Sequence, residues 1–75
     1  MGAYTEVDGG ENRMTIGEKL RQIRGDKSMV EVAEAIGVTY SSYIKYERNE
    51  RKPRAEVMHR IAKYYGKTID SLFFG

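Results

Sequence analysis

The sequence predicts an all-α fold made of five helices, and two features of the sequence lead to this prediction. From Met14 onward, apolar residues recur at spacings of three and four, which gathers them on one face of a helix. Between these stretches stand Ser or Thr residues that suit helix starts and glycines that suit helix ends. The alternating apolar and polar pattern of a half-buried strand does not occur. The 75 residues are enough for one small domain.

Residues 1–13 are predicted to precede this domain as a disordered tail or an expression scar. They are polar, contain the pair Gly9-Gly10, and show neither helical nor strand periodicity. Met14 would then be a native start. The folded domain is therefore expected over residues 14–75.

The first two helices are predicted from two capping boxes. Thr15 with Glu18, and Ser28 with Glu31, have the spacing at which a hydroxyl and a carboxylate satisfy each other's free backbone donors. The first helix is expected to end near Gly25. The residues predicted to face the core from these helices are Ile16, Leu20 and Ile23, then Val32, Ala33 and Ile36.

Three further helices are predicted after these. Thr39 is expected to cap a helix over about residues 39–48, and Pro53 then prevents this helix from continuing. Gly66 is expected to end the fourth helix, and Thr68 to cap a short fifth one. The inward residues of the three helices are Tyr43 and Tyr46, with Ser42 as a further candidate, then Val57, Met58, Ile61, Ala62 and Tyr65, then Leu72 and Phe73.

The strongest motif runs from Met29 to Arg48 and matches a helix-turn-helix. Two helices that cross steeply after a short turn approach so closely that the crossing point tolerates only a small side chain, here Ala33. The turn needs a positive φ, which Gly37 adopts at little cost. The apolar positions that would hold the two helices together are Val32, Ile36, Val38, Tyr43 and Tyr46. An ordinary αα-hairpin of a helical bundle would carry the same stripe.

The outward face of the third helix favours the helix-turn-helix over the hairpin. The residues on this face are Tyr40, Ser41, Ile44, Lys45 and Arg48, and several of them can hydrogen-bond to base edges or to phosphate. The polar and basic segment from Arg48 to Arg54 follows immediately.

Charge supports a nucleic-acid partner without deciding the matter. The net charge of +2 conceals an asymmetry, because one arginine against three acids leaves residues 1–14 at −2. From Thr39 to Lys67, eight basic residues stand against three acidic ones, which gives +5. A solvated helix face explains such a run of charge, and so does a surface that binds a polyanion.

Composition argues against several other classes of protein. There is no cysteine, so disulfides and thiolate metal sites are absent, and His59 is the only histidine. No carboxylate pair or glycine-rich phosphate loop is placed for catalysis, so no enzyme activity, cofactor, metal or small-molecule ligand is expected. No apolar run approaches the roughly 20 residues of a membrane helix, and no signal peptide opens the chain. A cytoplasmic protein is expected.

From Met14 to Phe74 the sequence resembles the Cro and phage-repressor helix-turn-helix family, also called the xenobiotic-response-element type, which has the lambda-repressor-like fold. The resemblance rests on the segments IGEKLRQIR, VEVAEAIGVTYSSYIKYERNERKPR and IAKYYGKTIDSLF, including the pairs Tyr46-Glu47 and Lys52-Pro53. It implies a bacterial or phage transcriptional regulator, repressor-like, that binds a specific double-stranded DNA operator with its third helix in the major groove.

The resemblance also implies roles for individual residues. Tyr40, Ser41 and Lys45 fall where the family reads bases. Glu47 matches an acidic residue that pairs with an arginine of the first helix, for which Arg24 is the candidate and Arg21 the alternative. The residues that fall where the family touches phosphates are Thr39, Arg48, Arg51, Lys52 and Arg54.

Three departures from the family pattern change details of this assignment. Met29 stands where the family has a glutamine that bonds a phosphate, so this contact is expected from Ser28 or from backbone N–H groups of the second helix. Asn49 stands where glycine is common, and asparagine enters the left-handed region more readily than most residues. The connection between the first two helices is shorter than usual.

The family usually dimerises on a palindrome, so a palindromic operator and a homodimer on DNA are expected. Tyr64 and Phe74 are candidates for the contact between the two copies. The alternative function is a protein-interaction module with the same fold, such as an antitoxin or a regulatory partner, whose exposed face binds protein instead of DNA.

Overall fold

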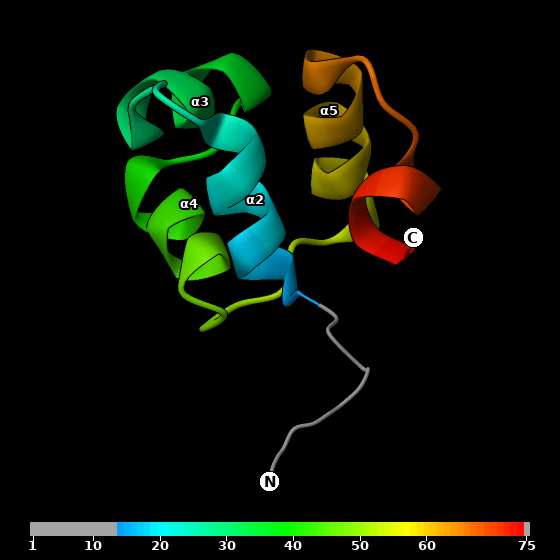
Figure 1. Ribbon diagram of the computed structural model, residues 1–75. Helices are drawn as coiled ribbons and strands as arrows, with labels where there is room; N and C mark the ends of the chain where they lie inside the picture. The colour runs from blue at the N-terminus through cyan, green and yellow to red at the C-terminus, as the bar shows by residue number, and fades with distance from the viewer. Residues whose placement is uncertain (1–13, 75) are drawn as a thin grey trace, which may run out of the picture.

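All five predicted helices are present in the computed structural model, which describes residues 14–74 (Figure 1). The predicted tail, residues 1–13, lies outside the described residues. No residue from 14 to 74 belongs to a strand, so the all-α prediction is confirmed. The elements are α2 (Ile16–Arg24), α3 (Met29–Ile36), α4 (Tyr40–Glu47), α5 (Ala55–Tyr65) and η1 (Asp70–Phe74).

The capping signals act as the sequence predicts, with one exception. Thr15 Oγ1 accepts the N–H of Glu18 at 3.1 Å, and the Glu18 carboxylate accepts the N–H of Thr15 at 2.9 Å, which completes the first capping box. At α3 only half of the predicted box forms. Ser28 Oγ accepts the N–H of Glu31 at 3.0 Å, but the Glu31 side chain is exposed to solvent and does not return a bond to Ser28.

The core is formed by the apolar faces of all five helices. In the view of Figure 1, α3 and α4 are drawn to the left of α2, and α5 and η1 to its right. Helix α2 packs against α4 and η1, while α3 packs against α4 and α5. The buried apolar residues are Leu20, Val32, Ala33, Ile36, Tyr43, Tyr46, Met58, Ile61, Ala62, Leu72 and Phe73. The remaining predicted inward residues, Ile16, Ile23, Val57 and Tyr65, pack at the edge of this core.

The turn between α3 and α4 has the geometry of a helix-turn-helix. Gly37 ends α3 with φ 77° and ψ 33°, a left-handed conformation that glycine adopts without a steric cost. The N–H of Val38 donates to the carbonyl of Ala33 at 3.0 Å and closes the turn. Ala33 is only 1% exposed, as expected of the small residue predicted at the crossing of the two helices.

The last element is a π-helix, where the sequence predicts a short helix of unspecified type. Thr68 caps it as expected, because its Oγ1 accepts the N–H of Ser71 at 3.1 Å. Neighbouring residues of an α-helix point about 100° apart. The wider π turn reduces this angle, and Leu72 and Phe73, which are adjacent in sequence, are both buried in the core.

The crossing of α3 and α4 predicts a difference between two alanines of α3. Ala33→Leu should lower the free energy of unfolding by about 1–3 kcal/mol, because the added atoms overpack the crossing point. Ala35→Leu should change it by less than about 0.5 kcal/mol, because Ala35 is exposed. Urea unfolding of both variants measures the difference, and equal losses would show that the crossing does not lie at Ala33.

Candidate nucleic-acid interface

Helix α4 is anchored by two tyrosines and presents its opposite face to solvent. Tyr43 is fully buried and Tyr46 is 6% exposed, so both rings belong to the core. Tyr40, Ser41 and Lys45 are exposed, and Tyr40 retains 46% of its accessible surface. The three residues predicted to contact bases therefore share the solvent-facing side of one helix. Ile44 is half-buried at the edge of this face.

The N-terminus of α4 is closed by its cap. Thr39 Oγ1 accepts the N–H of Ser42 at 3.1 Å and donates to Ser42 Oγ at 3.0 Å. Ser42, predicted as a further inward residue, is half-buried, and its hydroxyl bonds polar partners. Thr39 itself is exposed beside the start of the predicted base-contacting face.

The basic loop, residues 48–54, is folded back onto α4. The N–H groups of Glu50 and Arg51 both donate to the carbonyl of Lys45, at 2.9 and 3.3 Å. Pro53 is fully buried and fixes the far end of the loop. The four basic side chains of the loop, Arg48, Arg51, Lys52 and Arg54, are all exposed.

Two loop arginines have partners on the protein, and the other two basic residues have no ion pair with any described residue. Arg48 Nη2 lies 3.1 Å from the carboxylate of Glu50, in a pair whose side chains are 65% and 48% exposed. Arg51 Nη1 donates to Ser42 Oγ at 3.4 Å, which places this guanidinium against α4. Exposed pairs of this kind are weak, so these arginines can exchange their partners for a polyanion. The predicted phosphate-contacting residues of the loop thus lie directly beside the predicted base-contacting residues of α4.

The start of α3 is a separate part of the predicted interface. Ser28 is exposed, and its hydroxyl is occupied by the capping bond to Glu31. Met29 is half-buried and packs against the core, as expected of an apolar side chain. A phosphate at this position would therefore meet backbone N–H groups and the cap of α3.

Glu47, the last residue of α4, is buried and paired with helix α2. Its carboxylate accepts two bonds from Arg24, from Nε at 2.6 Å and from Nη2 at 3.1 Å. The side chain of Arg24 is 18% exposed and that of Glu47 is 5% exposed. Arg24 Nη1 also donates to the carbonyl of Lys27 at 2.8 Å. The bond with Glu47 is the main reason that the pKa of Arg24 is raised. Of the two arginines considered from the sequence, Arg24 makes the pair.

Arg21, the alternative partner, contacts the same residue at its backbone. Arg21 Nη2 donates to the carbonyl of Glu47 at 3.3 Å. This carbonyl lies at the C-terminus of α4, where a positive charge is favourable. Both arginines of α2 therefore hold the end of α4, one through its carboxylate and one through its main chain.

The sequence did not predict the role of Gly17, which lies within α2. A Cβ at this position would lie 2.2 Å from the carbonyl oxygen of Glu47 and 2.7 Å from its carbonyl carbon. No side chain fits there, so the backbone of α2 rests directly on the last residue of α4. A glycine inside a predicted helix costs about 1 kcal/mol relative to alanine, and this cost was the one signal in the sequence that pointed to a close contact.

Two tyrosine hydroxyls, one from α4 and one from α5, are buried inside the domain. Those of Tyr43 and Tyr65 have no hydrogen-bond partner among the described residues. Burial raises the pKa of Tyr65 to about 12, and burial together with the nearby Glu47 carboxylate raises the pKa of Tyr43 further above its ordinary value. Both side chains therefore stay neutral and serve as core residues.

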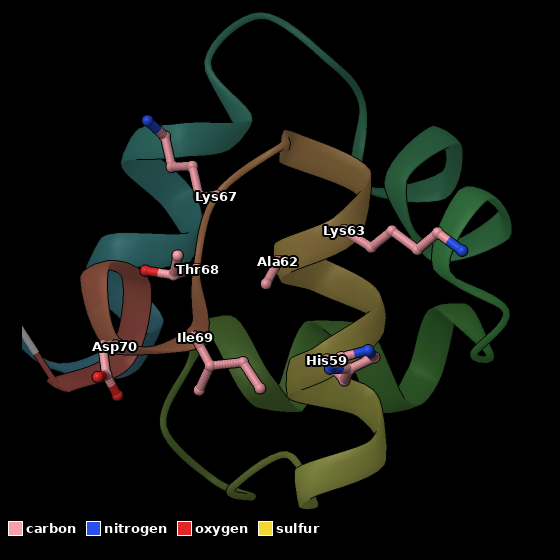
Figure 2. Close-up of a pocket in the computed structure, with 7 residues that line it drawn as sticks. All are labelled: His59, Ala62, Lys63, Lys67, Thr68, Ile69 and Asp70. Carbon is pink, nitrogen blue, oxygen red and sulfur yellow. The ribbon is translucent and has the colours of Figure 1, made fainter.

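The other surfaces of the domain lack a comparable arrangement. A shallow pocket of about 440 Å³ lies beside His59, and Figure 2 shows the ammonium groups of Lys63 and Lys67 pointing away from each other. Within residues 14–74, no three His, Cys, Asp or Glu side chains are grouped so that they could hold a metal ion. None of the helices in this part of the chain is long and apolar enough to cross a bilayer.

The fold and this face of α4 define the class to which the chain belongs. The sequence model of the helix-turn-helix family matches residues 18–72, most of the chain, so the protein is a member of the helix-turn-helix family. This agrees with the resemblance noted from the sequence.

Two known proteins are similar to the chain. The transcriptional repressor RstR of the cryptic phage CTXphi, from Vibrio cholerae, is 36% identical over an alignment of 56 residues, and the match covers 72% of this chain and 50% of that protein. The chain thus spans half the length of this curated relative. The P22 c2 repressor, solved in complex with a synthetic operator, superimposes with a TM-score of 0.77 at 23% identity, covering 84% of this chain and 98% of the other. This likeness confirms the phage-repressor type of fold.

The pair between Glu47 and Arg24 predicts a large effect of removing the carboxylate. Glu47→Ala should lower the free energy of unfolding by about 1–3 kcal/mol, because it leaves the half-buried Arg24 guanidinium without its carboxylate partner. Glu56→Ala is the matched control, since Glu56 pairs with Arg60 at 2.9 Å on the exposed face of α5. This control should lose no more than about 0.5 kcal/mol. Similar losses in urea titrations of the two variants would contradict the structural role of Glu47.

The contact at Gly17 predicts a reversal of the usual helix preference. Replacing an exposed glycine by alanine inside a helix typically stabilises a protein by about 0.5–1 kcal/mol. Gly17→Ala should instead destabilise the domain by about 1–3 kcal/mol, because the new methyl group meets backbone that cannot rotate away. Thermal unfolding gives the sign directly, and a stabilised variant would show that α2 and α4 do not touch here.

Proposed function

We propose that the chain binds double-stranded DNA at a specific site and represses transcription there, with α4 in the major groove. One observation carries the proposal: the exposed face of α4 continues directly into an exposed basic loop. A helix in the major groove needs polar side chains on its outer face to read base edges and positive charge beside it to hold the backbone. Membership in the helix-turn-helix family and the repressor relatives support the same function.

The base contacts are assigned to the outer face of α4. Lys45 can donate to O6 and N7 of guanine, and Ser41 can bond either type of base pair. Tyr40 can cover a thymine methyl group with its ring or bond a phosphate with its hydroxyl. Lys45 follows Ser41 by four residues, so the two side chains lie one above the other along the groove.

The phosphate contacts are assigned to the basic loop and to the starts of α3 and α4. The loop supplies Arg48, Arg51, Lys52 and Arg54, and the helix starts supply Ser28 and Thr39. Arg54 precedes α5, and its side chain makes no capping bond, so it is free to reach a phosphate. These contacts supply most of the affinity and its salt dependence, because each neutralised phosphate releases counterions.

A palindromic operator bound by two copies of the chain is part of the proposal. One helix-turn-helix covers one half-site, and a two-fold symmetric pair reads both halves of a palindrome. Tyr64 and Phe74 are 36% and 65% exposed and are the proposed contacts between the copies. The ring of Tyr64 packs edge-on against Tyr65, with 4.8 Å between the centroids, which holds it in place. The proposed setting is the cytoplasm, where bacterial DNA is accessible.

Two substitutions distinguish base contacts from phosphate contacts. Lys45→Ala should weaken binding to the preferred site by about 1–3 kcal/mol and relax the preference at one base position. Arg54→Ala should weaken binding to all sequences alike and lower the slope of log affinity against log salt by about one unit. The measurement is the affinity for a site selected from a random duplex pool, and for its single-base variants, at several salt concentrations.

The same experiment contains the results that would contradict the proposal. If Lys45→Ala weakened all sequences equally while Arg54→Ala changed the preferred base, α4 would not be the reading helix. A protein-interaction module would behave differently again, because the unmodified protein would show no salt-dependent binding to any duplex.

A further inference from the structure

Asn49 is the second residue of the basic loop, and its side chain bonds the start of α2. Its Oδ1 accepts the N–H of Gly17 at 3.0 Å, and its Nδ2 donates to Thr15 Oγ1 at 3.0 Å. These partners are 32 and 34 positions away in the sequence. Both polar atoms of the amide are therefore used within the protein.

The backbone of Asn49 also has a specific conformation and hydrogen bond. Its φ is 60°, and it is the one residue other than glycine with a positive φ among residues 14–74. Its N–H donates to the carbonyl of Tyr46 at 3.2 Å, at the C-terminal end of α4. The residue thus turns the chain out of α4 while its side chain is held by α2.

Asparagine is suited to both tasks at once. It tolerates the left-handed conformation better than most residues. Its side-chain amide carries an acceptor oxygen and a donor NH2 group, which bond an N–H group of α2 and the hydroxyl of Thr15. Glycine would keep the conformation and lose both bonds, and aspartate would keep the acceptor and lose the donor.

The chain of the basic loop turns away from the end of α4 at Asn49. The next two N–H groups, of Glu50 and Arg51, donate to the carbonyl of Lys45, so the path of the loop is fixed from Asn49 onward. A fixed loop presents its basic side chains to a phosphate backbone without the entropic cost of ordering them on binding.

We propose that Asn49 is a positioning residue for DNA binding: by tying the loop to the start of α2, it holds Arg51, Lys52 and Arg54 where they meet phosphates. It acts through these residues, because its Oδ1 and Nδ2 both bond groups at the start of α2. The proposal rests on the proposed function of the interface.

Asn49→Gly tests this role, because glycine keeps the positive φ and removes only the two side-chain bonds. The variant should bind the selected duplex about five- to tenfold more weakly, because the loop must now be ordered on binding. The preferred base at each position should not change. In the free protein, the amides of Glu50 and Arg51 should exchange with solvent faster than in the wild type, together with that of Gly17.

A core variant provides the matched control for stability. Ile61→Val removes one methyl group from a fully buried side chain of α5 and should lower the thermal midpoint at least as much as Asn49→Gly. At a temperature at which both variants are folded, Ile61→Val should bind DNA like the wild type. Its amides at Glu50 and Arg51 should also exchange like those of the wild type.

Each remaining outcome decides against the proposal. Unchanged affinity in Asn49→Gly would show that the loop needs no tie to α2. Weaker binding with unchanged exchange at Glu50 and Arg51 would show that Asn49 contacts DNA directly. If the wild type itself bound no duplex, the proposed function would fail. The exchange of the free variant would still show whether Asn49 holds the loop.

Discussion

The arrangement of the domain depends on the contact between α2 and the end of α4. Gly17 allows the two backbones to touch at the carbonyl of Glu47, and any larger residue would separate them. Arg21 bonds that carbonyl, and Arg24 bonds the carboxylate of the same residue. One residue of α4 is thus held through its main chain and its side chain by three residues of α2. An unpaired carboxylate or guanidinium would be costly in this partly buried place, so the pair stabilises the contact between the two helices.

This contact determines which face of α4 is free. With its C-terminal end held by α2 and with Tyr43 and Tyr46 in the core, the helix cannot rotate about its axis without exposing apolar surface. Tyr40, Ser41 and Lys45 must therefore face outward. The chain turns sharply at Asn49 because α2 also holds that residue. The exposed face of α4 and the basic loop are consequently both held by α2, which is not part of the proposed interface.

The features that could be predicted from the sequence obey local rules. The capping box of Thr15 and Glu18, the helix end at Gly37 and the apolar stripes each depend on residues a few positions apart. The structure contains all three features. Arg24 and Arg21 could not be told apart, because both lie on α2 and the choice depends on how that helix is rotated against α4. The contacts of Gly17 and Asn49 join residues 30 or more positions apart and follow from the packing distance between backbones, which no local pattern encodes. The π turn of η1 likewise depends on how Leu72 and Phe73 fit the core. The DNA contacts assigned to Lys45 and the loop remain predictions.

We propose above all that the exposed face of α4, together with the basic loop beside it, is the surface that meets DNA. Backbone amide chemical shifts followed by NMR during titration with the selected duplex test it most directly. We expect the largest changes at Tyr40, Ser41, Lys45 and the residues of the basic loop other than Pro53, while the exposed residues of α2 around Gln22 stay unchanged. Large changes on α2 with an unperturbed α4 would contradict the account.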